Sequence, residues 1–236
     1  MDATTDAPTP NINPMPVVII NSGAVILTAA KASLPIPLPT KIPSVITKMA
    51  EKIIVFQGDS VTDCGRSRET DQPNCGLGGG YPGLIAARLL ADHLDKELNV
   101  YNRGISGNRV VDLYARWKCD TLNLNPAVLS ILIGVNDSWH EYSNRNGVEV
   151  PRYAQFYRML LDWTLEKLPE TKLVLCEPFV LEFGFITPEW VAEMKERQEV
   201  VRGLAAEYGA VFVPLQQMLI EAAKKAGAPE KILGDG

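Results

Sequence analysis

The sequence predicts an α/β domain, a three-layer, flavodoxin-like sandwich with a central five-stranded parallel sheet. Two observations carry this prediction. Short apolar runs recur along the chain and stop near Gly, Pro or Asn, as strands buried on both faces of a sheet do. Longer segments with apolar residues at helical spacing lie between them. Strands that alternate with helices require right-handed crossovers, and therefore a parallel sheet covered on both faces.

Five strands are expected in chain order. They are residues 53–57 (IIVFQ), 99–102 (NVYN), 127–134 (AVLSILIG), 172–178 (KLVLCEP) and 210–215 (AVFVPL). Ligands of such sheets bind beyond the carboxyl ends of the strands. The site should therefore be lined by the segments that follow Gln57, Asn102, Ile133 and Cys176.

Five helices are expected between and after these strands. The first begins at Tyr81, with Pro82 in its first turn, where proline is tolerated. The others cover residues 110–117, 153–168, 188–208 and 216–226. The charged 188–208 segment is expected to be a surface-exposed helix. Gly227 and Pro229 close the last helix.

Composition excludes several classes of function. The chain has 236 residues, 46% of them hydrophobic, which is enough for one substantial core. A net charge of -5 without a run of Lys or Arg gives no footprint for nucleic acid or an anionic membrane surface. The four cysteines form no C-x-x-C pair and there are two histidines, so we expect reduced thiols, no metal and no cofactor.

Residues 1–48 differ from the rest in composition and are expected to form an irregular N-terminal extension. Their apolar run, PVVIINSGAVILTAA, is too short and broken for a membrane span. The charges ahead of it are Asp2 and Asp6, whereas a signal peptide carries positive charge there. Met49 is a natural start before the first core strand, so residues 1–48 need not be native and the domain is 49–236. We expect a cytoplasmic protein, with secretion as the alternative.

Three strand ends carry the residues of a catalytic site. GDS (58–60), NRGISGN (102–108) and GVND (134–137) follow the first three strands. Each has an ordinary alternative: a cap by Asp59 or Ser60, a glycine turn, and an Asx turn or helix cap by Asn136. Gly104 and Gly107 allow close approach of the backbone or a positive φ. Together, a Ser hydroxyl, a Gly N–H and an Asn amide make a nucleophile with an oxyanion hole.

These motifs resemble, in order, three of the four motif blocks of the SGNH (GDSL-like) hydrolases, and the resemblance covers residues 52–236. It implies that Ser60 is the nucleophile, and that the N–H groups of Ser60 and Gly107 and the side chain of Asn136 hold the oxyanion. A narrower likeness, in DCGR, LGGGY, NRGISGN with DLYARW, and IGVNDSWHEY, is to the bacterial acetyl-xylan esterase branch. That likeness implies a serine ester hydrolase that removes acetyl groups from carbohydrate.

The fourth block of the family is D-x-x-H, and the sequence ends ILGDG. Asp235 and Gly236 match its first two positions, so the catalytic histidine is expected two residues further on. Asp235 would orient it; an ordinary turn is the alternative. We therefore interpret the domain as C-terminally truncated, with the family's final helix missing and activity nearly absent.

Further residues near the strand ends are expected to contact the substrate: Asp59, Asn108, Trp139 and His140. Trp139 would stack on a sugar. For His140, a polar loop residue and a role as the base are the alternatives. Asp63 and Arg66 are expected to pair, either as a brace of the nucleophile loop or as a surface salt bridge. For Trp117, a place in the hydrophobic core is expected, and stacking on a sugar is the alternative.

Two other functions stay open. A lysophospholipase or thioesterase of the same family would need a long apolar groove. A hydroxyl-rich ligand suits the polar residues of these loops better: Arg103, Asn108, Arg109, Asp137 and Trp139. A noncatalytic carbohydrate-binding module is the second. A nucleotide binder is set aside, because no phosphate-binding glycine motif is present. The expected partner is a small-molecule or oligosaccharide ester, with no nucleic acid and no membrane; a homo-oligomer is left open.

Overall fold

The computed structural model describes residues 17–21, 24–28 and 52–233. The chain divides into two compact units, residues 1–47 and 48–236. In the first unit, β1 (Val17–Asn21) pairs antiparallel with β2 (Ala24–Thr28). The functional motifs all belong to the second unit, which is described below by itself.

A five-stranded sheet forms the centre of this unit. Its strands are β3 (Lys52–Gly58), β4 (Leu98–Asn102), β5 (Val128–Leu132), β6 (Lys172–Cys176) and β7 (Val211–Val213). They lie in the order β4-β3-β5-β6-β7, and all neighbours are parallel. Counted from β3, this order is 2-1-3-4-5, the flavodoxin-like order, so the predicted fold class is confirmed.

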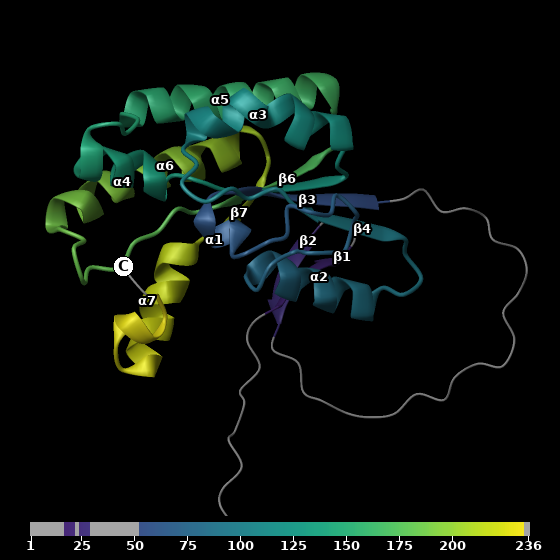
Figure 1. Cartoon of the computed structure of the whole chain (residues 1–236), viewed down its shortest axis with the longest axis horizontal. Coiled ribbons are helices and arrows are strands. Elements are labelled where there is room, and N and C mark those ends of the chain that lie inside the picture. Colours follow the sequence, from purple (N-terminus) through teal and green to yellow (C-terminus); the bar gives the residue numbers. More distant parts are fainter. Residues whose placement is uncertain (1–16, 22–23, 29–51, 234–236) are drawn as a thin grey trace, which may run out of the picture. The chain divides into compact units, whose positions relative to one another are not determined.

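Helices cover both faces of the sheet. They are α1 (Ser60–Asp63), α2 (Tyr81–Asp92), α3 (Val110–Asp120), α4 (Val135–Asn144), α5 (Val150–Lys167), α6 (Pro188–Glu207) and α7 (Leu215–Ala226). Short 3-10 turns span Leu122–Leu124 and Pro229–Lys231. Figure 1 shows α3, α5 and α6 on one face of the sheet and α2 on the other. In the described part of the chain, no helix is long and apolar enough to span a membrane.

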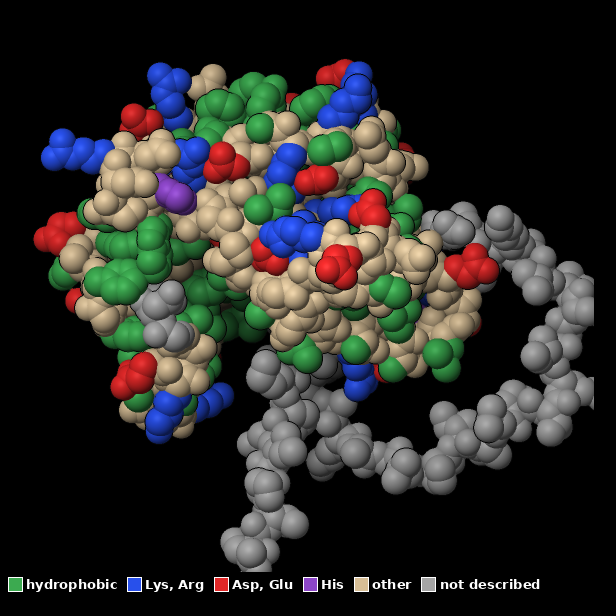
Figure 2. Space-filling model, viewed as in Figure 1, with side chains coloured by type: hydrophobic (Ala, Val, Ile, Leu, Met, Phe, Trp, Pro, Cys, Tyr) green, Lys and Arg blue, Asp and Glu red, His purple; other side chains and the backbone are tan. Residues whose placement is uncertain are grey.

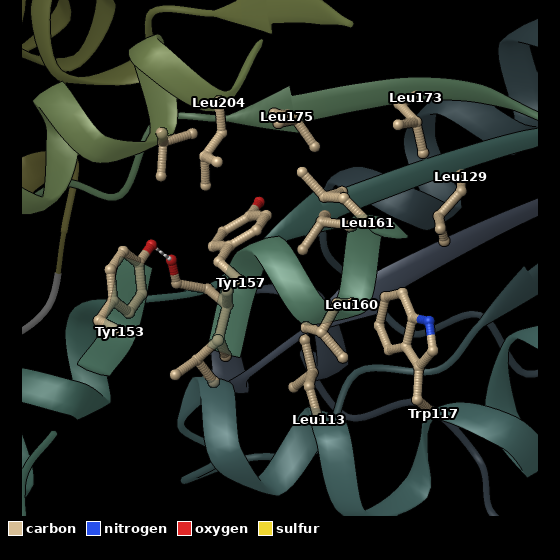
Figure 3. Close-up of a cluster of buried hydrophobic side chains, with 14 of the residues drawn as sticks. Leu113, Trp117, Leu129, Tyr153, Tyr157, Leu160, Leu161, Leu173, Leu175 and Leu204 are labelled. Carbon is tan, nitrogen blue, oxygen red and sulfur yellow. Dashed lines mark hydrogen bonds between the residues drawn. The ribbon is translucent and has the colours of Figure 1, made fainter. Parts of the chain in front are cut away.

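The alternation of side chains along β3 explains the three layers. Val55 joins the cluster beneath α3, α5 and α6, whereas Ile54 and Phe56 pack against α2 on the opposite face. Figure 3 shows the larger cluster, in which Leu160 and Leu161 of α5 pack with side chains of the sheet. Because both faces of β3 are buried, its sequence reads as a nearly continuous apolar run.

The helix at 188–208 differs from its prediction. We expected it at the surface, but one face of α6 is buried and includes Trp190, Met194 and the fully buried Arg197. The helices α1 and α4 were not predicted. Trp117 is fully buried and donates its indole N–H to Thr164 Oγ1 at 3.0 Å, so its placement in the core is confirmed.

Candidate active site

The first strand end presents Ser60 to solvent. Asp59 caps α1: its Oδ1 accepts a hydrogen bond from the backbone N–H of Val61 at 3.1 Å. Ser60 is the first residue of this helix and is exposed. The Asp59 side chain itself is buried, and this burial raises its pKa to about 7. Asp59 therefore shapes the turn that carries Ser60.

Ser60 and Asn136 share one pocket of about 200 Å³. It lies at the carboxyl ends of β3, β5 and β6, where the order of the strands predicts a ligand site. Trp139 also lines it, as do residues that follow β6. The lining residues are Asp59, Ser60, Val61, Leu132, Ile133, Val135, Asn136, Trp139, Pro178, Phe179 and Leu233.

The loop after β4 is tied to the Ser60 turn. The N–H of Ile105 donates to the carbonyl of Gly58 at 3.0 Å. Asp63 Oδ2 accepts from both the backbone N–H and the hydroxyl of Ser106, at 3.0 and 2.9 Å. Gly107 follows with φ +82°, a left-handed conformation that favours glycine. The loop that holds Gly107 is thus held in place by α1, although Gly107 itself does not line the pocket.

Asn136 and His140 hold the same loop from the other side. Asn136 lies in the first turn of α4 and donates from Nδ2 to the carbonyl of Asn108 at 3.1 Å. His140 donates from Nε2 to the carbonyl of Gly107 at 2.9 Å. Asn108 also accepts a hydrogen bond from Arg116 through its side chain, at 2.7 Å. The structure therefore brings Ser60, the Gly107 loop and Asn136 together.

Several expected contacts are replaced by others. Asp63 pairs with Arg68 at 2.7 Å, whereas Arg66 donates to the carbonyl of Gly104, so the expected pair of Asp63 and Arg66 is wrong. Asp137 is fully buried and accepts from the N–H of Val110, and burial raises its pKa to about 7. It therefore offers nothing to a ligand.

Arg103 and Arg109 pair with Asp71 and Asp112. Of the polar residues that we expected to suit a hydroxyl-rich ligand, only Trp139 lines the pocket. Asp235, the expected partner of the histidine, lies outside the described residues.

Sequence reasoning missed the apolar walls of the pocket. Pro178 and Phe179 follow β6, as the rule on strand ends implies, but they belong to no motif. Leu233 comes from beyond the last helix. These residues make the pocket largely apolar around Ser60 and Asn136.

Comparisons with known proteins identify the family of this chain. The profile of the GDSL-like Lipase/Acylhydrolase family matches residues 56–232. An acetylxylan esterase from Geobacillus stearothermophilus is 36% identical over 174 residues, which cover 72% of this chain and 79% of that protein.

Two solved structures are similar along most of their length. A GDSL-like protein from Parabacteroides merdae has a TM-score of 0.73 and 43% identity, covering 76% of this chain and 84% of its own. The Geobacillus acetylxylan esterase structure has a TM-score of 0.68 and 32% identity, covering 76% and 83%.

Structures also exist of catalytic mutants of the Geobacillus enzyme, in which a serine, an aspartate or a histidine is replaced by alanine. In that enzyme, the replaced aspartate precedes the replaced histidine by three positions. This chain therefore belongs to the GDSL-like lipase/acylhydrolase family and shares the fold of its esterases and acylhydrolases.

Proposed function

We propose that this protein is a serine ester hydrolase that removes acetyl groups from carbohydrate through an acyl-enzyme on Ser60. The observation that carries the proposal is the pocket shared by Ser60 and Asn136, whose amide also donates to the carbonyl of Asn108 in the loop that contains Gly107. A relative named as an acetylxylan esterase supports the choice of substrate.

The proposed reaction begins when the hydroxyl of Ser60 attacks the ester carbonyl. The resulting oxyanion accepts hydrogen bonds from the N–H groups of Ser60 and Gly107 and from the amide of Asn136. Each such donor typically contributes about 3 kcal/mol to the transition state. The sugar leaves as an alcohol that takes up a proton, and water then releases acetate from Ser60.

The base of this mechanism is a histidine in the block that Asp235 begins. His140 is poorly suited to that role, because its Nε2 already donates to the carbonyl of Gly107 and it does not line the pocket. We propose that the catalytic histidine lies two residues after Gly236. The 236-residue chain would then hydrolyse esters very slowly, since loss of a triad histidine costs about 10⁶ in turnover.

The pocket favours a short acyl group over a long one. Its volume of about 200 Å³ is smaller than the roughly 300–1,000 Å³ of sites that bury a drug-sized ligand. Apolar walls such as Val135 and Phe179 suit the methyl group of acetate. The small volume of this pocket thus supports acetyl transfer better than lysophospholipase activity.

The test uses the chain extended by the natural gene's own continuation beyond Gly236. We expect it to release acetate from acetylated xylooligosaccharides and to prefer 4-nitrophenyl acetate over 4-nitrophenyl octanoate. Ser60→Ala should lower kcat by about 10⁶. Ser143→Ala is the matched control, because Ser143 is an exposed residue of α4.

Three results would count against the proposal. Full activity of Ser60→Ala would show that the nucleophile lies elsewhere. A preference for octanoate would instead indicate an enzyme for long acyl chains. A stop codon directly after Gly236 would favour the noncatalytic carbohydrate-binding module.

A further inference from the structure

Four aromatic side chains gather beside the pocket and form what we name the aromatic shelf: Trp139, Tyr142, Phe185 and Trp190. Trp139 and Tyr142 come from α4, Trp190 from the start of α6, and Phe185 from the segment before it. Figure 2 shows hydrophobic side chains gathered on this side of the molecule, where Figure 1 places α4.

Trp190 is the buried base of the shelf, with only 3% of its surface exposed. The ring of Tyr142 lies nearly parallel to it, with centroids 5.1 Å apart and planes at 19°. Trp139 meets Trp190 edge-on at 5.4 Å, and Phe185 meets Trp139 edge-on at 5.0 Å. These contacts fix the exposed rings in place, so a ligand would not have to order them.

Two rings of the shelf face solvent. Phe185 is 55% exposed and Tyr142 is 46% exposed. Because Trp190 covers one face of Tyr142, the exposed surface of Tyr142 belongs largely to its other face. A flat ring face open to water is the surface on which the C–H face of a pyranose packs, while the hydroxyl groups of the sugar stay hydrated.

The shelf is continuous with the site of the proposed chemistry. Trp139 lines the pocket that holds Ser60 and also contacts Phe185 and Trp190. A sugar whose acetyl group enters the pocket would therefore have its neighbouring rings beside Phe185 and Tyr142.

The size of the exposed surface distinguishes a sugar from a second protein chain. Aromatic side chains have areas of roughly 150–250 Å², so two half-exposed rings offer on the order of 200 Å². A stable protein interface needs about 800 Å² on each partner. The shelf is thus too small for a dimer interface by itself and large enough for one or two sugar rings.

The geometry points to a carbohydrate subsite: the aromatic shelf binds the sugar rings next to the acetylated one and so selects oligosaccharides over small esters. This inference rests on the proposed deacetylase function. It assigns a part in binding to Tyr142, at the end of IGVNDSWHEY, and to Phe185 and Trp190, which lie in no motif.

Binding of unacetylated xylohexaose, measured by titration calorimetry with the 236-residue chain, tests the shelf without any need for catalysis. We expect Tyr142→Ala and Phe185→Ala each to weaken binding about fivefold. Tyr142→Phe keeps the ring and should bind as the unchanged chain does. Leu94→Ala, which removes another exposed apolar side chain, should also leave binding unchanged.

Equal affinity of both alanine variants and the unchanged chain would overturn the inference, as would a lack of binding at millimolar xylohexaose. So would a dimer in sedimentation that Phe185→Ala dissociates. The two proposals can fail separately. A failed esterase assay together with xylohexaose binding that depends on the shelf would contradict the proposed function alone. An active esterase whose alanine variants bind xylohexaose unchanged would contradict the shelf alone.

Discussion

Two aspartates within four residues of each other have opposite electrostatic environments. Asp59 is enclosed, and desolvation outweighs the hydrogen bonds that it accepts from backbone N–H groups and raises its pKa to about 7. For Asp63, burial acts in the same direction, but hydrogen bonds from Ser106 and the charge of Arg68 outweigh it and lower the pKa. The first carboxylate therefore opposes folding when it is charged, and the second favours it.

Asp59→Asn should change how stability depends on pH. Between the unfolded pKa near 4 and the folded pKa of about 7, the native state binds more protons than the unfolded state. The free energy of unfolding therefore falls as pH rises through this window. Asparagine removes this contribution, so the variant should gain stability relative to the unchanged chain between pH 4.5 and 8 in urea titrations. The exposed Asp95→Asn is the control, and a constant difference across pH would contradict the prediction.

Asp63→Asn should have the opposite pH dependence. The lowered pKa means that the charged carboxylate stabilises the fold above the unfolded pKa, and that this contribution is lost as pH falls through the folded pKa. Loss of hydrogen bonds to a buried charge costs about 2 kcal/mol. We expect that loss at pH 7 and a smaller one at pH 3, measured by urea unfolding. Glu69→Gln, an exposed neighbour, should be neutral, and a loss that grows in acid would refute this account.

At the scale of elements, Arg197 connects α6 to α4. It is fully buried, donates from Nε to Ser138 Oγ at 3.0 Å and from Nη2 to the carbonyl of Val148 at 2.6 Å, and pairs with Glu193. Its guanidinium also lies 5.1 Å from the ring centroid of Tyr153. Since α4 carries Asn136, this arginine supports the candidate site from behind.

Arg197→Met should cost about 3 kcal/mol, because removal of one member of a buried ion pair leaves polar groups without partners. The exposed pair of Arg158 and Glu207 provides the comparison, and Arg158→Met should cost less than about 1 kcal/mol. Both losses can be read from urea unfolding. Adding Glu193→Gln to Arg197→Met should cost less than the sum of the two single changes. Equal losses for the two arginine variants would contradict a supporting role for Arg197.

Elements with a strong apolar pattern could be predicted from the sequence, and others could not. All five strands were found because each contains a short apolar run, which is longest in the central strands β3 and β5. The helix α4 (VNDSWHEYSN) was missed because its polar residues include the buried Asn136, Asp137 and Ser138, which hides the apolar stripe. The buried face of α6 was missed for the same reason, since Arg197 there reads as a solvent-exposed charge.

At the scale of the whole molecule, the five-stranded sheet is complete within residues 48–236. The meeting of GDS, NRGISGN and GVND could be predicted, because β4, β3 and β5 are neighbours and their carboxyl ends lie at one edge. Side-chain contacts that depend on how the elements pack could not be predicted. The contact of Trp139 with Phe185, for example, depends on how α4 and the segment before α6 fold over each other.

A chain that begins at Lys48 should therefore fold as the 236-residue chain does. Two antiparallel strands such as β1 and β2 are marginally stable by themselves, and the larger unit has its own core. We expect the free energies of unfolding of the shorter chain and the 236-residue chain to agree within about 0.5 kcal/mol, the deviation typical of sites that act independently. Urea unfolding followed by circular dichroism measures them. A loss of several kcal/mol would show that residues 1–47 contribute to the larger unit.

The close fit between α1 and the loop after β4 has a consequence for how the protein can evolve. A Cβ on Gly104 would overlap the backbone of Thr62 and Asp63, so a mutation there would shift the helix α1 that begins at Ser60. Val135 and Phe179, by contrast, line the pocket with their side chains. Under the proposed function, selection for a new acyl length would exchange those two residues and leave the backbone around Ser60 unchanged.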